Sequence, residues 1–175
     1  MPSTFPEDLD KGLGPEDYVV RTAARKNSEV FNRLLQRGEK KGGRLVVLSA
    51  DTVVVGPHGE ILEKPGSREH ARAMLLSLGS SSHSVFTGVT LAVEGLEPVS
   101  FYEETVVKFT DLTLEAVEAY LDTGEYVGKA GGYGIQGLAG AVLVSGVEGC
   151  YYNVVGLPLF STCRVLTDLV KNFCT

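Results

Sequence analysis

The segment that most constrains the fold is residues 45–55, LVVLSADTVVV, an apolar run rich in β-branched valine. β-Branched side chains fit a pleated sheet, and a short continuous apolar run is typical of a strand that is buried on both faces. The sequence therefore predicts a central strand that other elements cover. The run is interrupted by SADT at residues 49–52, so the carboxylate of Asp51 is expected inside this strand.

Asp51 is a candidate functional residue because of this position. Burying an ionised carboxylate without a partner costs several kcal/mol, so such a residue is normally paired, protonated or bound to a metal. In one interpretation Asp51 lies at the strand end and caps a turn. In the other it takes part in ligand chemistry, since α/β folds bind ligands at the carboxyl ends of their strands. The position favours the second interpretation.

The remaining periodicities predict helices and strands that do not strictly alternate. Apolar residues at helical spacing follow the proline and acids of residues 14–17, and Lys26 lies at the edge of that apolar stripe. The expected elements are helices over residues 15–35, 68–78, 114–123 and from 158 onward, and strands over 45–55, 84–93, 99–109 and 141–147. This order indicates an α/β or α+β fold with a sheet of mixed strand direction, and of these we predict α/β, a mixed twisted sheet flanked by helices.

Three details of these elements are specific enough to check. The turn EGLEP at residues 94–98 joins the two long strands as an antiparallel hairpin. Thr87 and Gly88, inside the first of those strands, indicate a close approach of backbone or ligand. The last helix is expected to bury Leu159, Cys163, Leu166 and Val170.

The composition excludes several classes of protein. A chain of 175 residues is expected to form one domain, residues 1–175. The net charge of −6 and the lack of a basic cluster argue against binding to a nucleic-acid polymer. No apolar run approaches the roughly 18 residues of a membrane span, and residues 1–11 lack the apolar core of a secretory signal. Cys150, Cys163 and Cys174 fit no metal spacing, so a reduced, cytoplasmic setting is expected.

Residues 129–137, KAGGYGIQG, form a glycine-rich segment whose chemistry suits a ligand. Glycine lets the backbone approach a ligand closely. Lys129 offers three donors to an anion, and Gln136 offers a donor and an acceptor to the edge of a heterocycle. A nucleotide site is one interpretation of this segment. A tight turn with Tyr133 packed in the core is the other.

Two further polar residues also have two interpretations. Pro65 biases Lys64 toward an extended conformation, which would direct the ammonium group toward a phosphate. A lone lysine in a turn is, however, usually solvated. His83 opens the first hairpin strand and is interpreted as a structural or surface residue rather than a catalytic base.

Taken together, five ordered motifs resemble those of the Maf family of nucleoside triphosphate pyrophosphatases. The motifs are SADTVV at residues 49–54, ILEKP at 61–65, HSVFTGV at 83–89, KAGGYGIQG at 129–137 and NVVGLP at 153–158. They follow the family's order, and the resemblance covers essentially the whole chain. It implies a fold related to that of the inosine triphosphate pyrophosphatases.

The resemblance implies hydrolysis of a nucleoside triphosphate to the monophosphate and pyrophosphate, with a divalent metal, Mg or Mn. The tyrosine and glutamine version of the glycine-rich segment is similar to that of the branch acting on dTTP and UTP. A homodimer is expected by analogy with the family. The site residues that the resemblance assigns are, for catalysis, Asp51, Lys64 and Gln136; for substrate binding, Lys26, Thr52, Lys129 and Tyr133; and for the metal, Asp51 and Glu7.

Two departures from the family pattern bear on activity. Family members begin with a strand and a Ser-x-Ser-Pro-Arg-Arg motif that supplies phosphate-binding groups, and no equivalent is found in this sequence, which is therefore expected to be truncated relative to the family. Gly128 stands where an acid commonly precedes the loop lysine. One hypothesis is an active pyrophosphatase that clears noncanonical or excess pyrimidine nucleotides. The alternative is a noncatalytic variant that binds nucleotide weakly or pairs with a full-length subunit.

Overall fold

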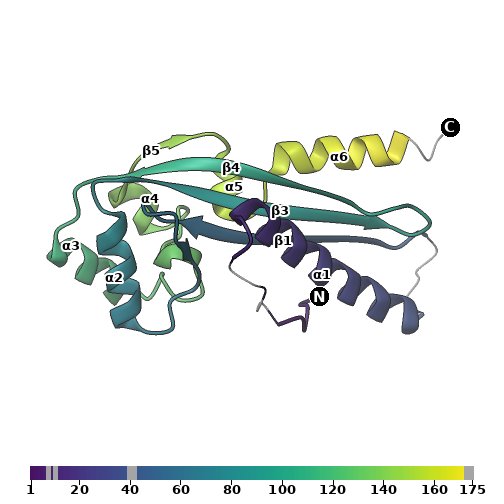
Figure 1. Cartoon of the computed structure of the whole chain (residues 1–175), viewed down its shortest axis with the longest axis horizontal. Helices are drawn as coiled ribbons and strands as arrows, with labels where there is room; N and C mark the ends of the chain where they lie inside the picture. Colours follow the sequence, from purple (N-terminus) through teal and green to yellow (C-terminus); the bar gives the residue numbers. More distant parts are fainter. Residues whose placement is uncertain (7–8, 10–11, 39–42, 172–175) are drawn as a thin grey trace.

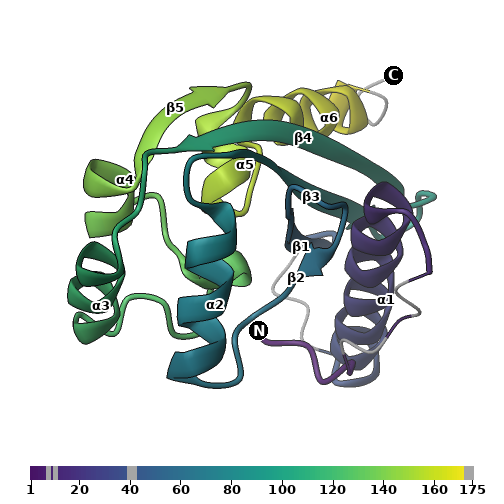
Figure 2. The same cartoon turned by 60° about the vertical axis from the view of Figure 1, so that its left-hand side comes forward.

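The computed structural model describes residues 1–6, 9, 12–38 and 43–171, in which helices pack against a five-stranded sheet (Figures 1 and 2). The strand order is β2-β1-β3-β4-β5, and each neighbouring pair is antiparallel. The strands are β1 (Val46–Val55), β2 (Ile61–Leu62), β3 (Ser82–Val93), β4 (Val99–Phe109) and β5 (Val144–Glu148). The helices are α1 (Pro15–Gln36), α2 (Arg68–Leu78), α3 (Leu114–Asp122), α4 (Leu138–Val142), α5 (Tyr151–Val155), α6 (Leu159–Lys171) and the 3-10 helix η1 (Ala130–Gly132). None of these described helices is both long enough and apolar enough to cross a membrane.

The predicted α/β class, a sheet flanked by helices, is confirmed. The strands β1, β3 and β4 and the helices α1, α2 and α3 end within two residues of the predicted limits. The expected mixed strand direction is not seen among the described strands, because β2 and α2 return the chain so that β3 runs antiparallel beside β1. The strand expected over residues 141–147 begins later, since α4 extends to residue 142.

Side-chain caps fix the starts of α2 and α3. The hydroxyl of Ser67 accepts a hydrogen bond from the backbone N–H of His70, and that of Thr113 accepts one from Ala116. Each bond satisfies a donor that a helix leaves open in its first turn. Both helices contribute to the largest buried cluster, which also contains Tyr133 of the glycine-rich segment, so the caps help to place that segment.

α1 lies directly against the sheet at Gly88 of β3. An ideal Cβ built on Gly88 would lie 2.4 Å from the carbonyl carbon and oxygen of Val19, so a residue without a side chain is required there. Beside this contact, Tyr18 and Val19 pack on Phe86 and Val53 in a buried cluster. The expected close approach at Gly88 is confirmed, and the group that approaches is the backbone of α1.

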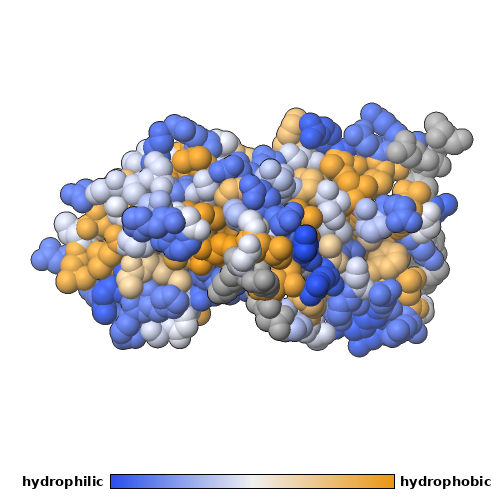
Figure 3. Space-filling model, viewed as in Figure 1, coloured by the Kyte–Doolittle hydropathy of each residue, from blue (hydrophilic) through white to orange (hydrophobic). Residues whose placement is uncertain are grey.

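The predicted burial on α6 is wrong. The four residues that were expected to be buried lie at the surface: Leu159, Cys163, Leu166 and Val170. Thr162 and Leu169 face inward instead, and Leu169 packs with Leu91 and Val93 of β3. Apolar atoms are visible at the upper right of Figure 3, where Figure 1 places α6. Helical spacing identified an apolar stripe, but the rotation of the helix is set by which side chains fit the sheet.

Candidate active site

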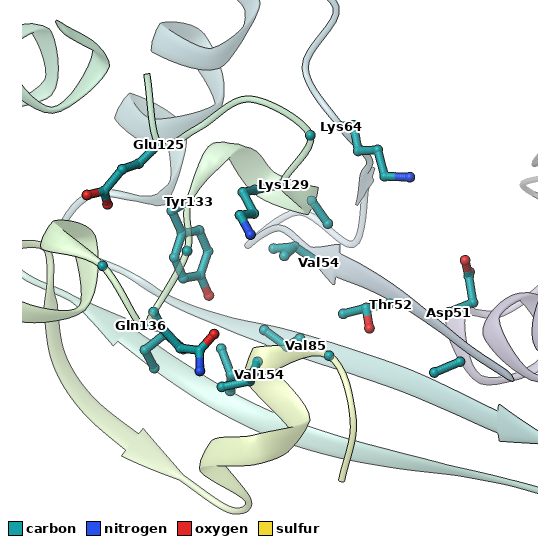
Figure 4. Close-up of a pocket in the computed structure, with 18 of the residues that line it drawn as sticks. Asp51, Thr52, Val54, Lys64, Val85, Glu125, Lys129, Tyr133, Gln136 and Val154 are labelled. Atoms are coloured by element: carbon teal, nitrogen blue, oxygen red, sulfur yellow. The ribbon is translucent and has the colours of Figure 1, made fainter. Parts of the chain in front are cut away.

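A cavity of about 600 Å³ lies beside β1, between α1 and the glycine-rich segment. Figure 4 shows Asp51 toward one end and Tyr133, Gln136 and Glu125 toward the other. The residues assigned to the site that line this cavity are Lys26, Asp51, Thr52, Lys64, Lys129, Tyr133 and Gln136. Glu7, which was assigned to the metal, lies outside the described residues. The fold therefore brings side chains from distant parts of the sequence to one concave surface.

Lys26 and Asp51 form an ion pair in the wall of the cavity. Nζ of Lys26 donates to Oδ1 of Asp51 at 2.6 Å, and the two side chains are only 16% and 8% exposed. The carboxylate thus has the cationic partner that its burial requires. α1 is held in place for this contact by Ser49, whose hydroxyl donates to the carbonyl of Ala23 at 2.7 Å.

Thr52 belongs to a chain of hydrogen bonds that crosses β1 and β3. The hydroxyl of Thr87 donates to the backbone carbonyl of Asn153 at 3.0 Å, and Oγ1 of Thr52 lies 2.9 Å from Oγ1 of Thr87. Because a hydroxyl carries one proton, Thr52 is then the donor to Thr87 and presents only lone pairs to the cavity. Asn153 is itself fixed by Nδ2, which donates to the carbonyl of Val85 and to Oγ1 of Thr105.

The glycine-rich segment turns tightly against β1. Gly131 and Gly132 have φ angles of 67° and 76°, in the left-handed region that side chains disfavour. A Cβ on Gly131 would also lie 2.9 Å from Cγ2 of Val54. The consecutive glycines are therefore needed for both the backbone conformation and the packing on the strand.

The next residue, Tyr133, is packed in the core. Its hydroxyl lies 2.8 Å from Nε2 of His83, and its ring meets that of Phe109 edge to face at 4.9 Å. Lys129 and Gln136, in contrast, remain exposed at the cavity. The segment thus combines the packed tyrosine of one interpretation with the solvent-facing polar groups of the other.

His83 is buried, so of the two roles expected for it, structural or surface, the structural one is confirmed. Burial lowers the pKa of His83 from 6.5 to about 4, since the charged imidazolium would lose its hydration. In the folded chain the ring is therefore neutral near pH 7. It supports Tyr133 through their hydrogen bond and does not face the cavity as a charged group.

The free energy of unfolding is expected to fall as the pH drops from 6.5 toward 4. The unfolded chain protonates His83 with a pKa near 6.5, whereas the folded chain resists protonation until about pH 4, so this stability is fully present above pH 6.5. The loss amounts to at most about 3 kcal/mol. Urea denaturation across this range measures it. A His83→Gln variant, which keeps a partner for Tyr133 but does not titrate, should show a flatter profile; equal profiles would contradict the assignment.

Glu118 affects the free energy of unfolding in a lower pH range, so it does not interfere with the test of His83. Arg72 and Arg68 donate hydrogen bonds to its carboxylate and lower its pKa from 4.5 to about 2. The stability from this group is present above pH 4.5 and is lost as the pH falls toward 2. The effect of His83 therefore precedes that of Glu118 during acidification.

Lys64 lies at the rim of the cavity beside the glycine-rich segment. Its neighbour Glu63 is held on two sides: the carboxylate accepts from the hydroxyl of Tyr18 at 2.8 Å, and the carbonyl accepts from the N–H of Gly131 at 3.2 Å. These bonds fix the backbone from which Lys64 extends. Figure 4 shows its ammonium group directed toward the side of the cavity where Asp51 lies.

Gly128 and Glu125 also line the cavity. Gly128 has a φ angle of 72°, so its backbone conformation suits glycine, and it offers no side chain where the family pattern has an acid. Glu125 supplies a carboxylate from the same stretch of chain. Sequence reasoning missed it because an acid in the turn after a helix carries no periodic signal. It also missed the anchoring role of Asn153, although this residue opens one of the five motifs.

Comparison with known proteins agrees with the motifs. A family model described as Maf-like protein matches residues 1–169. The probable bifunctional dTTP/UTP pyrophosphatase/methyltransferase protein of Homo sapiens is 44% identical over 97% of this chain, which spans 28% of the length of that protein. The dTTP/UTP pyrophosphatase of Symbiobacterium thermophilum is 46% identical over 88% of this chain, and the match covers 74% of the length of that protein. The dTTP/UTP pyrophosphatase of Halalkalibacterium halodurans is 45% identical over 94% of this chain, and the match covers 80% of its length. Because the family model matches nearly the whole length of this chain, the chain belongs to the Maf family.

Proposed function

We propose that this chain hydrolyses dTTP and UTP to their monophosphates and pyrophosphate. The observation that carries the proposal is that one cavity holds the Lys26–Asp51 pair, two further lysines and the amide of Gln136 (Figure 4). Its volume lies in the range of roughly 300–1,000 Å³ typical of small-molecule sites. The bacterial relatives, which are described as dTTP/UTP pyrophosphatases, support the choice of substrate.

In the proposed reaction a water molecule attacks the α-phosphorus. The new bond joins the water oxygen to that phosphorus, and the bond to the bridging oxygen breaks, so that pyrophosphate leaves. Asp51 accepts the proton from the attacking water, as a general base within hydrogen-bond reach of it. Lys26 holds Oδ1 of Asp51 and thereby fixes the orientation of the carboxylate.

The lysines of the cavity offset the charge of the triphosphate. Lys26, Lys64 and Lys129 line one cavity of a protein whose net charge is −6, so the cations are concentrated locally. Preorganised cations stabilise the charge that develops on a leaving phosphate in a site shielded from water. We assign phosphate binding to these three residues.

The residues present fit a divalent metal that is held mainly by the substrate. Within the described part of the chain no three His, Cys, Asp or Glu side chains cluster as a metal site. Mg²⁺ in nucleotide sites needs only one or two carboxylates, because phosphate oxygens and waters complete its shell. Asp51, together with Glu7, would hold Mg or Mn, and the bound ion supplies further charge stabilisation on the pyrophosphate.

The far end of the cavity has the polar groups to read a pyrimidine. Gln136 offers a donor and an acceptor, which match the alternating N–H and carbonyl groups of uracil and thymine. Thr52, which presents lone pairs only, suits a hydroxyl or N–H of the nucleoside rather than a phosphate oxygen. Tyr133, Val54 and Val85 also line the cavity and supply apolar surface for the nucleoside.

The test is release of pyrophosphate and monophosphate from dTTP, UTP, CTP, GTP and 7-methyl-GTP, with magnesium or manganese. We expect turnover of dTTP and UTP that depends on the metal and exceeds turnover of the purine nucleotides by about 10-fold or more. Equal rates on all five would contradict the assignment of base recognition. Absence of product from a folded sample would contradict the catalytic proposal and leave nucleotide binding alone.

Three expectations about the setting of the chain stay predictions. They are a single domain over residues 1–175, a homodimer and a cytoplasmic location. Mass measurement in solution tests the dimer, and limited proteolysis tests the domain.

A further inference from the structure

We propose that Glu125 is a positioning residue that holds Gln136 in the cavity, an inference that rests on the proposed function of this site. Oε2 of Glu125 accepts a hydrogen bond from the backbone N–H of Leu138 at 2.9 Å. Leu138 comes two residues after Gln136, so the contact ties the segment that carries the amide to the turn that follows α3.

The absence of a side chain at Gly137 makes this contact possible. A Cβ built on Gly137 would lie 2.1 Å from Oε2 and 2.8 Å from Cδ of Glu125. The carboxylate therefore fills the space that a side chain would take. Figure 4 shows Glu125 and Gln136 extending from separate stretches of chain at the same end of the cavity.

Gln136 is held on its other side by a second close contact. Ile135 is buried, and a Cβ on Gly140 would lie 1.8 Å from its carbonyl oxygen, so the backbone of α4 sits directly against it. The N–H of Gly137 also donates to the carbonyl of Gly134 at 3.1 Å. Ile135 is thus anchored by packing, whereas Leu138, on the other side of Gln136, is anchored by the carboxylate of Glu125. Loss of Glu125 releases one end of this short span.

The experiment is a double-mutant cycle between Glu125 and Gln136. Glu125→Ala removes the acceptor, and we expect kcat/KM for UTP to fall about 10-fold, because a small misplacement of a binding group is costly. Glu125→Gln retains an oxygen that can accept from Leu138 and should stay within about 3-fold of the parent. In a Gln136→Ala background, Glu125→Ala should have little further effect, since it acts through the missing amide. Glu115→Ala, an exposed acid on α3, is the matched control and should change nothing.

Three results would overturn the proposal. Additive losses in the cycle would show that Glu125 acts independently of Gln136. An equal loss in Glu125→Gln and Glu125→Ala would show that its charge acts on the substrate directly. Unchanged kcat/KM in Glu125→Ala, even with a lower melting temperature, would show a role in stability alone.

Hydrogen exchange at the Leu138 amide separates this proposal from the proposed function. Exchange should be about 10-fold faster in Glu125→Ala than in the parent and unchanged in Glu125→Gln, without nucleotide present. If the parent chain shows no turnover, the same cycle is run on the dissociation constant of a nonhydrolysable UTP analogue. Unchanged exchange in Glu125→Ala contradicts the positioning contact whatever the activity of the chain.

Discussion

Replacement of Asp51 by asparagine is expected to lower kcat/KM for dTTP and UTP by about 10³-fold or more. The amide cannot accept a proton from water, and it is a poorer ligand than a carboxylate for a divalent cation. Because asparagine has nearly the same volume as aspartate, the packing of β1 is retained. Pyrophosphate release, normalised to the folded fraction from circular dichroism, measures the effect.

The ion pair with Lys26 makes a stability control necessary. Replacing Asp51 removes a charged partner at 2.6 Å, which is expected to lower the free energy of unfolding by about 1–3 kcal/mol. The matched control is Asp17→Asn, which removes an exposed pair with Arg21 at 3.3 Å. It should leave activity intact and change stability by less than about 1 kcal/mol. If Asp51→Asn were as active as this control, the role of Asp51 as the base would be excluded.

The parts of the fold that the sequence predicted correctly have strong local signals. The apolar run before and after Asp51 has few alternatives to a strand, although Val46 and Leu48 near its start are exposed and not buried as expected. Ser67 and Thr113 cap the helices that they precede. Gly88 was expected to mark a close approach, because glycine inside a strand otherwise weakens it. In each case a few neighbouring residues are enough to specify the local structure.

The features that were missed depend on partners distant in the sequence. The rotation of α6 is decided by how Leu169 fits Leu91 and Val93, which the spacing along the helix does not contain. The orientation of the Thr52 hydroxyl follows from Thr87 and from a carbonyl in α5. The motifs identified the residues of the candidate site. The direction of each hydrogen bond, however, could be deduced only from the contacts between strands and helices in the folded structure.

Gly88→Ala is expected to destabilise the fold strongly, although it adds only one methyl group. The new Cβ would lie 2.4 Å from the carbonyl carbon and oxygen of Val19 and 2.6 Å from the nitrogen of Val20. These are backbone atoms of a helix, so no side-chain rotation relieves the overlap and α1 must shift away from β3. We expect the free energy of unfolding to fall by about 3 kcal/mol, the upper end of the usual cost of overpacking. Urea denaturation measures this change.

The same variant tests whether α1 couples the core to the site. α1 carries Lys26, whose ammonium group meets Asp51 at 2.6 Å, so a displacement of the helix at Val19 should also disturb that pair. Activity per folded molecule is therefore expected to fall by about 10-fold, beyond the loss from unfolding. Gly43→Ala is the matched control, since a Cβ there meets no atom of the described residues within 4 Å, and it should keep both stability and activity. A destabilised Gly88→Ala variant with full activity would mean that Lys26 adjusts independently of the helix backbone, and equal stability of the two variants would contradict the close packing of α1.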